Sequence, residues 1–241
     1  MAIVTRKAAR RPRDYLRVSG PDAEDFLQRM LSNDVSQSCD ALLLTPKGRI
    51  IAPLRVLRRG GDDFLLLTEP GLGERVRTTL LRARFAAKCQ IEPEEHSSTL
   101  VWENGFAAAS EELDADVEPT VENEELERAR IEAGVPAWGK EIDDSILPAE
   151  AGLDRTHISF TKGCYPGQEP IARLHHRGHA NRTLRRLEAE AAKPGEEIRH
   201  DGKAVGRITS AAPGIALGYV RREVPAGAKV ELESGKARSL D

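Results

Sequence analysis

The sequence predicts an α+β fold, because helical and strand patterns mix along the chain without strict alternation of strand and helix. Before residue 182, segments with helical apolar spacing lie among short apolar runs that Gly, Pro and Asp residues bound. From residue 182 onward only short strand patterns remain. The hydrophobic content of 39% suits a globular protein with a real core, and the aromatic content of 4% leaves that core to Leu, Ile, Val and Ala.

The N-terminal half predicts both helices and strands. A helix is expected over residues 21–33, with Pro21 in its first turn and an apolar face of Phe26, Leu27, Met30 and Leu31. Residues 41–69 predict strand, Pro-Lys-Gly turn, strand, Gly-Gly-Asp-Asp hairpin and strand. The acidic residues 111–127 predict a solvated loop and helix face. Further strands are expected over 13–20, 88–93 and 98–103, and further helices over 71–85 and 122–134.

The C-terminal part predicts a small β-barrel or sandwich. Its strand patterns are separated by Gly and Pro turns and cover residues 182–190, 196–211, 214–220 and 228–234. The change in pattern places a domain boundary near residue 182. We therefore expect one region over 1–182 and a small C-terminal barrel over 183–241.

Charge and cysteine content exclude some classes of protein. A formal net charge of −3 gives no global field for nucleic acid or membranes, and no apolar run approaches the roughly 20 residues of a membrane helix. The N-terminal residues contain no continuous apolar segment like a secretory signal. Cys39, Cys89 and Cys164 are odd in number and far apart, which argues against a disulfide framework and for a reducing compartment. We therefore expect a cytoplasmic protein.

The stretch TKGCYPGQEPIAR places a cysteine in an unusual setting. Cys164 has turn-forming residues on both sides and Lys162 two positions before it, whereas a core cysteine usually lies among aliphatic residues. Pro166 and Pro170 favour the first turn of a helix that Gly178 would end, so we expect Cys164 at or just before a helix N-terminus. The helix dipole and the lysine would there favour a thiolate.

Several interpretations of this segment stay open from the residues alone. The flanking glycines would let a reactant approach the sulfur, so the thiol is either reactive or ligand-contacting, or else a small buried hydrophobe in a tight turn. A metal site is not favoured, because the spacing from Cys164 to His175, His176 and His179 matches no zinc module. The local arginines either suit an anionic small molecule or are solvated charges. They are Arg173, Arg177, Arg182, Arg185 and Arg186.

The motif KGCYPGQE, followed by IAR and RG, resembles the signature of the YgfZ family. These are folate-binding proteins of iron–sulfur maintenance that are related to the glycine cleavage T-protein. The segment RARIEAGVPAWGKEIDDSILPAEAGL is also similar, with an Arg-x-Glu-Ala-Gly core and a later Leu-Pro-x-Glu that T-proteins share. LSNDVSQ and LLLTPKGRI resemble the N-terminal part. The resemblance covers nearly the whole chain, most strongly over 128–182, and it favours a functional Cys164.

The resemblance implies a multi-lobed, ring-like fold with folate in a central opening. The expected lobes interleave, one over 1–45 with 118–182 and the other over 46–117. In T-proteins the glutamate of Arg-x-Glu-Ala-Gly recognises the pteridine ring, and the matching residue is Glu132, whose carboxylate could accept two parallel hydrogen bonds from a pterin. Without the resemblance, this residue would be a surface acid at a helix end. The other predicted folate-binding residues are Lys162, Tyr165, Gln168, Arg173, Arg177 and Arg182, one of these arginines meeting the glutamate tail of the folate.

One departure from the T-protein pattern concerns catalysis. T-proteins carry an acidic pair in the frame Gly-x-Ile-x-Asp-Asp-Leu, and one aspartate of this region is essential to aminomethyl transfer. The frame here is GRIIAPL, so that Ala52 and Pro53 occupy the acidic positions. Neither side chain can orient the reacting nitrogen or stabilise a developing positive charge. We therefore expect no glycine-cleavage aminomethyltransferase activity, even where folate binds.

The residues and the resemblance together favour a tetrahydrofolate-binding accessory factor that supports iron–sulfur cluster assembly or repair in client enzymes, including ones that modify tRNA. Cys164 would protect a cluster, accept a one-carbon or sulfur adduct, or contact the folate. Cys39 and Cys89 are not in ligand spacing, so we expect no stable cluster or other metal. Tyr165 would either pack over a ligand ring or fill the core, and Gln168 would either bind a ligand or cap the helix.

Two other functions stay open. One is a folate-dependent one-carbon transferase with a cysteine-based mechanism. The other is a scaffold that keeps the fold and has lost its ligand. For the favoured function, the expected partners are folate and iron–sulfur client or assembly proteins, without direct contact to nucleic acid or membranes, and we expect a monomer.

Overall fold

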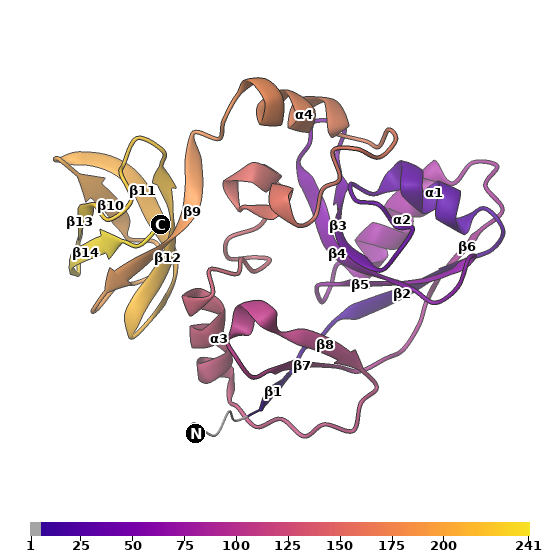
Figure 1. Ribbon diagram of the computed structural model, residues 1–241, viewed down its shortest axis with the longest axis horizontal. Coiled ribbons are helices and arrows are strands. Elements are labelled where there is room, and N and C mark those ends of the chain that lie inside the picture. Colours follow the sequence, from indigo (N-terminus) through magenta and orange to yellow (C-terminus); the bar gives the residue numbers. More distant parts are fainter. Residues whose placement is uncertain (1–5) are drawn as a thin grey trace. The chain divides into compact units, whose positions relative to one another are not determined.

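The computed structural model describes residues 6–241, and the chain folds into two compact units. Unit 1 comprises the described part of Met1–Arg11 together with Ser98–Ile142 and Ala180–Asp241. Unit 2 comprises Pro12–Ser97 and Asp143–His179. Each unit therefore collects segments that are distant in the sequence, as the colours of Figure 1 show. The lobe boundaries expected from the T-protein resemblance stay a prediction.

Unit 2 is built on a five-stranded antiparallel sheet with the order β3-β4-β5-β2-β6. Buried and partly exposed side chains alternate along β4, whereas β5 is buried from Phe64 to Thr68. A strand that is covered on both sides needs a continuous apolar run, which is the pattern FLLLT. The strands are β2 (Asp14–Ser19), β3 (Cys39–Leu44), β4 (Ile50–Arg58), β5 (Asp63–Thr68) and β6 (Gln90–Pro93).

Two helices contact this sheet, namely α1 (Ala23–Met30) and α2 (Gly73–Ala83) (Figure 1). Their apolar residues recur at helical spacing, so each helix has one apolar face toward the sheet. Phe26 and Leu27 of α1 and Leu80 of α2 are buried. Full burial of such a side chain stabilises the fold by about 1.5–3 kcal/mol. Both helices were expected from the sequence and are confirmed.

The second segment of unit 2 carries α4 (Gln168–Arg177), after the short 3-10 helices η2 (Pro148–Glu150) and η3 (Leu153–Arg155). Gly178 follows α4 as its C-cap residue, as predicted. Cys164 lies in the turn that precedes this helix. No helix within residues 6–241 combines the length and the apolar character needed to cross a membrane.

Unit 1 contains a three-stranded antiparallel sheet, β1-β7-β8, and the helix α3 (Asn123–Glu132). An apolar cluster joins this sheet to the helix, with Leu100 and Trp102 on one side and Leu126 and Ala129 near them. Burial of this cluster fixes the helix that ends at Glu132. The strands are β1 (Lys7–Arg10), β7 (Ser98–Trp102) and β8 (Ser110–Leu113), with the 3-10 helix η1 (Phe106–Ala108) between the last two.

The rest of unit 1 is a closed barrel with the strand order β10-β11-β12-β9-β14-β13 (Figure 1). Closure leaves no strand edge free for pairing with other chains. The interior is aliphatic and includes Leu187, Ile198, Ile208 and Val220. The predicted small C-terminal barrel is confirmed. Its strands are β9 (Arg182–Ala189), β10 (Glu197–His200), β11 (Lys203–Ala212), β12 (Gly214–Arg221), β13 (Lys229–Leu232) and β14 (Gly235–Ser239).

Some strands were not expected from the sequence. β8 lies in the acidic stretch predicted as a loop and pairs with β7, because an edge strand tolerates charged side chains toward solvent. β1 and β14 are short and rich in basic residues, so they show no apolar alternation. The strand pattern over 196–211 forms two strands rather than one. It is divided into β10 and β11 by a turn at Asp201 and Gly202, both with positive φ, as a tight hairpin turn requires.

Candidate functional site

The Cys164 turn is exposed in unit 2. Thr161, Gly163 and Cys164 are exposed, and a Cβ atom placed on Gly163 would meet nothing within 4 Å. The alternative of a small buried hydrophobe is therefore excluded for Cys164. The other cysteines differ: Cys89 is buried, and burial raises the pKa of the partly buried Cys39 to about 11. Among the cysteines, the structure thus exposes the one that the motif singles out.

Lys162 fixes the start of this turn. Its Nζ atom donates hydrogen bonds to the carbonyl oxygens of Leu31, at 2.8 Å, and Asn33, at 2.7 Å. Leu31 is the C-cap residue of α1, so the lysine satisfies a carbonyl at a helix end, where such groups lack partners within the helix. Burial lowers the pKa of Lys162 to about 8, while the charges of Asp34 and Cys39 act in the opposite direction.

The residues after Cys164 form a second anchor. The ring centroid of Tyr165 lies 5.6 Å from the Lys162 Nζ atom, and burial raises the pKa of the tyrosine to about 12. Gly167 has a φ of +85°, and a Cβ atom there would lie 2.6 Å from the Thr45 carbonyl oxygen and 3.0 Å from the Gly48 Cα atom. The KGCYPGQE motif therefore packs directly on the Pro-Lys-Gly turn after β3, where only glycine fits.

The strand β4 lacks the acidic pair of T-proteins at the expected place. Ala52 is fully buried and lies opposite Leu43 of β3. Pro53 is partly exposed, and its carbonyl oxygen accepts a hydrogen bond of 2.9 Å from the Thr68 hydroxyl. Neither residue offers an ionisable group for proton transfer or charge stabilisation.

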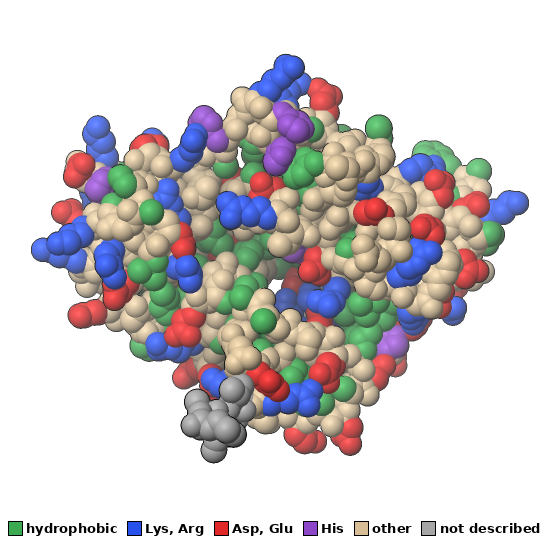
Figure 2. Space-filling model, viewed as in Figure 1, with side chains coloured by type: hydrophobic (Ala, Val, Ile, Leu, Met, Phe, Trp, Pro, Cys, Tyr) green, Lys and Arg blue, Asp and Glu red, His purple; other side chains and the backbone are tan. Residues whose placement is uncertain are grey.

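The exposed face of α4 carries rings and basic groups. His175 stacks on Phe160 with ring centroids 3.9 Å apart, and His176 meets His175 edge-on. Figure 2 shows histidine side chains at the surface over α4, beside Lys and Arg side chains. Arg173 pairs with Glu169 at 2.7 Å. Within residues 6–241, no group of three or more His, Cys, Asp and Glu residues is arranged to hold a metal ion.

Two further predicted residues of this segment lie at the ends of α4. Gln168 is its first residue, and its backbone N–H donates to the Tyr165 carbonyl oxygen at 3.2 Å. The helix has no side-chain cap, which excludes the second of the two alternatives for Gln168, that it caps the helix. Arg177 is the last residue of α4 and is exposed.

Glu132 is the last residue of α3 in unit 1, and its side chain is half exposed. Arg128, one turn earlier, donates from Nε to the Glu132 Oε1 atom at 2.7 Å and from Nη1 to the Pro213 carbonyl oxygen at 2.9 Å. The Glu132 backbone carbonyl accepts a hydrogen bond from Arg186 at 3.1 Å. Its Oε2 atom is left to accept a further hydrogen bond.

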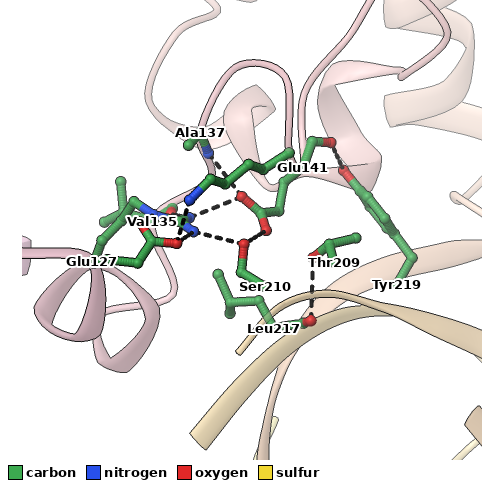
Figure 3. Close-up of polar contacts among 10 residues, drawn as sticks. Glu127, Val135, Ala137, Glu141, Thr209, Ser210, Leu217 and Tyr219 are labelled. Atoms are coloured by element: carbon green, nitrogen blue, oxygen red, sulfur yellow. Dashed lines mark hydrogen bonds and ion pairs between the residues drawn. The ribbon is translucent and has the colours of Figure 1, made fainter. Parts of the chain in front are cut away.

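The neighbouring Arg130 is buried in a polar network that links α3 to the barrel (Figure 3). It donates to the Glu141 carboxylate at 2.8 Å, to the Ser210 hydroxyl at 2.8 Å and to the Glu127 carboxylate at 2.7 Å. Figure 3 shows Glu141 directed toward Ser210, whose hydroxyl donates to it at 2.6 Å. The Tyr219 hydroxyl donates to the Glu141 backbone carbonyl at 2.8 Å. The arginine of the Arg-x-Glu-Ala-Gly motif is therefore a structural anchor for the helix that carries Glu132.

The predicted site residues belong to both units. Glu132 and Arg182 are in unit 1, where the Arg182 guanidinium lies 4.9 Å from the ring centroid of Tyr219. The predicted residues of unit 2 are Lys162, Cys164, Tyr165, Gln168, Arg173 and Arg177. Within unit 2 the structure brings Lys162, Tyr165 and the Cys164 turn together. That one of Arg173, Arg177 and Arg182 binds the glutamate tail of folate stays a prediction.

Sequence reasoning missed Arg128 and the acceptors of Lys162. The spacing of Arg128 and Glu132 is i, i+4, which is a readable signal for a helical ion pair. No such signal exists for Lys162, because its acceptors are backbone carbonyls more than 120 residues earlier. The same holds for Arg130 and Ser210, which are 80 residues apart.

Comparison with known proteins agrees with this geometry. Residues 172–238 match the family model described as CAF17, C-terminal beta-barrel domain. The chain is 28% identical over 229 residues to the tRNA-modifying protein YgfZ of Klebsiella pneumoniae. This match covers 73% of this chain and 69% of that protein. It is 31% identical over 231 residues to the mitochondrial iron-sulfur cluster assembly factor IBA57 homolog of Mycosarcoma maydis, covering 75% of this chain and 56% of that protein. The resemblance to the YgfZ family is confirmed.

The fold of this YgfZ-like chain is also that of a T-protein. The crystal structure of glycine cleavage system aminomethyltransferase T from Bartonella henselae matches with a TM-score of 0.80 and 19% identity, covering 97% of this chain and 84% of that chain. At this identity the likeness concerns the fold alone. The α+β class with a T-protein-like fold and a C-terminal barrel is therefore confirmed. The YgfZ-like chain spans little more than half of the Mycosarcoma protein.

Proposed function

We propose that this YgfZ-like chain is a tetrahydrofolate-binding accessory factor that supports the assembly or repair of iron–sulfur clusters in client enzymes, including enzymes that modify tRNA. The observation that carries the proposal is the exposed, free thiol of Cys164 in an anchored turn. The relatives support it, because one is named a tRNA-modifying protein and another an iron-sulfur cluster assembly factor. In this proposal the protein is a cytoplasmic monomer. Its partners are folate and proteins that contain iron–sulfur clusters.

The proposed role of Cys164 follows from its isolation. A cluster of four irons needs four ligands, and the other two cysteines are buried or partly buried. The cluster therefore belongs to the client, and Cys164 acts on it as a protecting or accepting thiol. Its exposure supports this role, because a thiol that meets a second protein must be reachable from solvent.

The proposed folate site centres on Glu132. Its Oε2 atom would accept from the amino and ring N–H groups of the pterin, as the matching glutamate does in T-proteins. Tetrahydrofolate supplies one-carbon chemistry when it is bound. Ala52 and Pro53 of β4 favour a site that binds folate and does not catalyse aminomethyl transfer. Neither side chain can take up a proton or stabilise charge at the reacting nitrogen.

The cluster role is tested by genetic rescue. Deleting the gene should lower the activities of iron–sulfur enzymes, and the wild-type chain should restore them. Cys164→Ala should fail to restore them, whereas the matched control Cys39→Ala should succeed. Rescue by Cys164→Ala at the wild-type level would remove the thiol from the proposal.

The folate role is tested by titrating the purified protein with tetrahydrofolate. Glu132→Gln removes a charged acceptor, and charge-assisted hydrogen bonds contribute about 1.5–3 kcal/mol each, so the affinity should fall about 10- to 100-fold. Glu188→Gln, which changes an exposed acid of the barrel that pairs with Arg238, serves as the control. An assay of glycine cleavage separates the alternative, since a one-carbon transferase would turn over and the proposed factor would not.

A further inference from the structure

The Cys164 turn is held at both of its ends and free between them. Before the cysteine, Lys162 bonds to the end of α1, and after it, Gly167 packs on the turn at Thr45. Between these anchors Gly163 and Cys164 are exposed, and Gly163 has open space around it. Removing either anchor would therefore release the backbone that carries the thiol.

Two donors of Lys162 are directed at backbone carbonyls of the protein. An ammonium group has three N–H donors, and two of them are used by the carbonyl oxygens of Leu31 and Asn33. The groups that face the amine are Asp34, Cys39 and the ring of Tyr165. A ligand that took over either of these two donors would leave a carbonyl oxygen near the end of α1 without its partner.

The contact needs only two of the three N–H donors of the ammonium group. Burial lowers the pKa of Lys162 to about 8, so part of the population is neutral under mildly alkaline conditions. A neutral amine keeps two N–H donors, which is the number that Leu31 and Asn33 require. The lysine can therefore hold the turn in either charge state.

We propose that Lys162 is a positioning residue, which fixes the Cys164 turn against the C-terminal end of α1 and does not itself bind folate. The proposal rests on the proposed function of Cys164 and deepens it, because it identifies what keeps the thiol in place. The lysine of the KGCYPGQE motif thus has a structural role in the loop and does not contact the ligand.

The direct test is amide hydrogen exchange. Lys162→Met keeps the length of the side chain and removes its donors. Exchange should become at least tenfold faster at the hydrogen-bonded amides of residues 162, 168, 31 and 32 and stay unchanged in the barrel. Lys162→Arg, which keeps donors for both carbonyls, should restore slow exchange. Lys88→Met, on an exposed lysine of the same unit, is the matched control. Unchanged exchange in Lys162→Met would overturn the proposal.

The functional test is a double-mutant cycle in the rescue assay. Lys162→Met should lose rescue as Cys164→Ala does, and the double variant should be no worse than either single variant, because both act through one thiol. Tetrahydrofolate affinity should stay within about twofold of wild type. A tenfold loss of that affinity would make Lys162 a ligand-binding residue and overturn the proposal. Failure of the proposed function gives another combination of results. Cys164→Ala would then rescue fully, while Lys162→Met would still show faster amide exchange.

Discussion

Replacing Arg130 with Met should destabilise unit 1 more than replacing Glu141 with Gln. Arg130 and Glu141 are both buried, and their ion pair measures 2.8 Å. Without the arginine, the Glu141 carboxylate keeps the Ala137 N–H and the Ser210 hydroxyl but loses its buried counter-ion. Without the Glu141 charge, Arg130 still pairs with Glu127 at 2.7 Å. Arg130→Met therefore leaves a buried carboxylate without its counter-ion, whereas Glu141→Gln leaves Arg130 paired.

The magnitudes follow from this asymmetry. Removing one partner of a buried ion pair costs about 3–5 kcal/mol, which is the expected loss in the free energy of unfolding for Arg130→Met. Glu141→Gln should cost about 1–3 kcal/mol, because a hydrogen-bonded charge is replaced by an amide while Glu127 compensates the arginine. The double variant should cost less than the sum, since it leaves no unpaired charge. Tyr219→Phe removes one hydrogen bond to the Glu141 carbonyl and should cost about 1 kcal/mol.

Urea unfolding followed by tryptophan fluorescence measures these values. Both tryptophans of the chain, Trp102 and Trp138, lie in unit 1, so the signal reports the unit that contains the network. The unfolding free energy comes from linear extrapolation to zero urea. A loss below about 1 kcal/mol for Arg130→Met, or a larger loss for Glu141→Gln, would refute the reasoning.

Three further outcomes are expected. Gly167→Ala should lower the unfolding free energy by about 1–3 kcal/mol, because its φ is +85° and its Cβ would lie 2.6 Å from a carbonyl oxygen, whereas Gly163→Ala should change it by less than about 0.5 kcal/mol. Equal effects in urea unfolding would contradict this. Arg128→Ala should tighten tetrahydrofolate binding about twofold in calorimetry, because an exposed ion pair with Glu132 contributes about 0.3–0.5 kcal/mol; weaker binding would show that the arginine contacts the ligand. Hydrogen bonds from Arg130 and Lys140 lower the pKa of Glu127 from 4.5 to about 2, so its stabilisation is complete above pH 4.5 and is lost as the pH falls toward 2. The unfolding free energy of Glu127→Gln should therefore fall less steeply over this range, and identical slopes would exclude the effect.

The elements that the sequence predicted share strong local signals. The helices α1 and α2 have apolar residues at helical spacing, and the strands β3, β4 and β5 have apolar runs bounded by Pro-Lys-Gly and Gly-Gly-Asp-Asp turns. The strands β1, β8 and β14 have charged sequences and no such signal. They become strands because a partner strand, distant in the sequence, supplies their hydrogen bonds.

The candidate site divides in the same way. Gly and Pro residues around Cys164 predicted a turn before a helix, and the structure contains that turn. The anchors of the turn were not predicted, because the Lys162 side chain bonds to carbonyl groups, which every residue has and which no residue type marks. For Glu132 the helical pattern predicted the position at a helix end, while the contact of Arg128 with the barrel residue Pro213 depends on the fold.

By itself, the sequence determined the α+β class, the barrel after residue 182, the cysteine in its turn and the absence of the T-protein acidic pair. These features depend on local patterns and on residue identity. Only the tertiary structure decided that Cys164 is exposed, that Lys162 binds the end of α1 and that Arg130 is buried with Glu141. The physical reason is that exposure and pairing depend on which distant segments pack together, and burial strengthens or penalises a charge only once its surroundings exist.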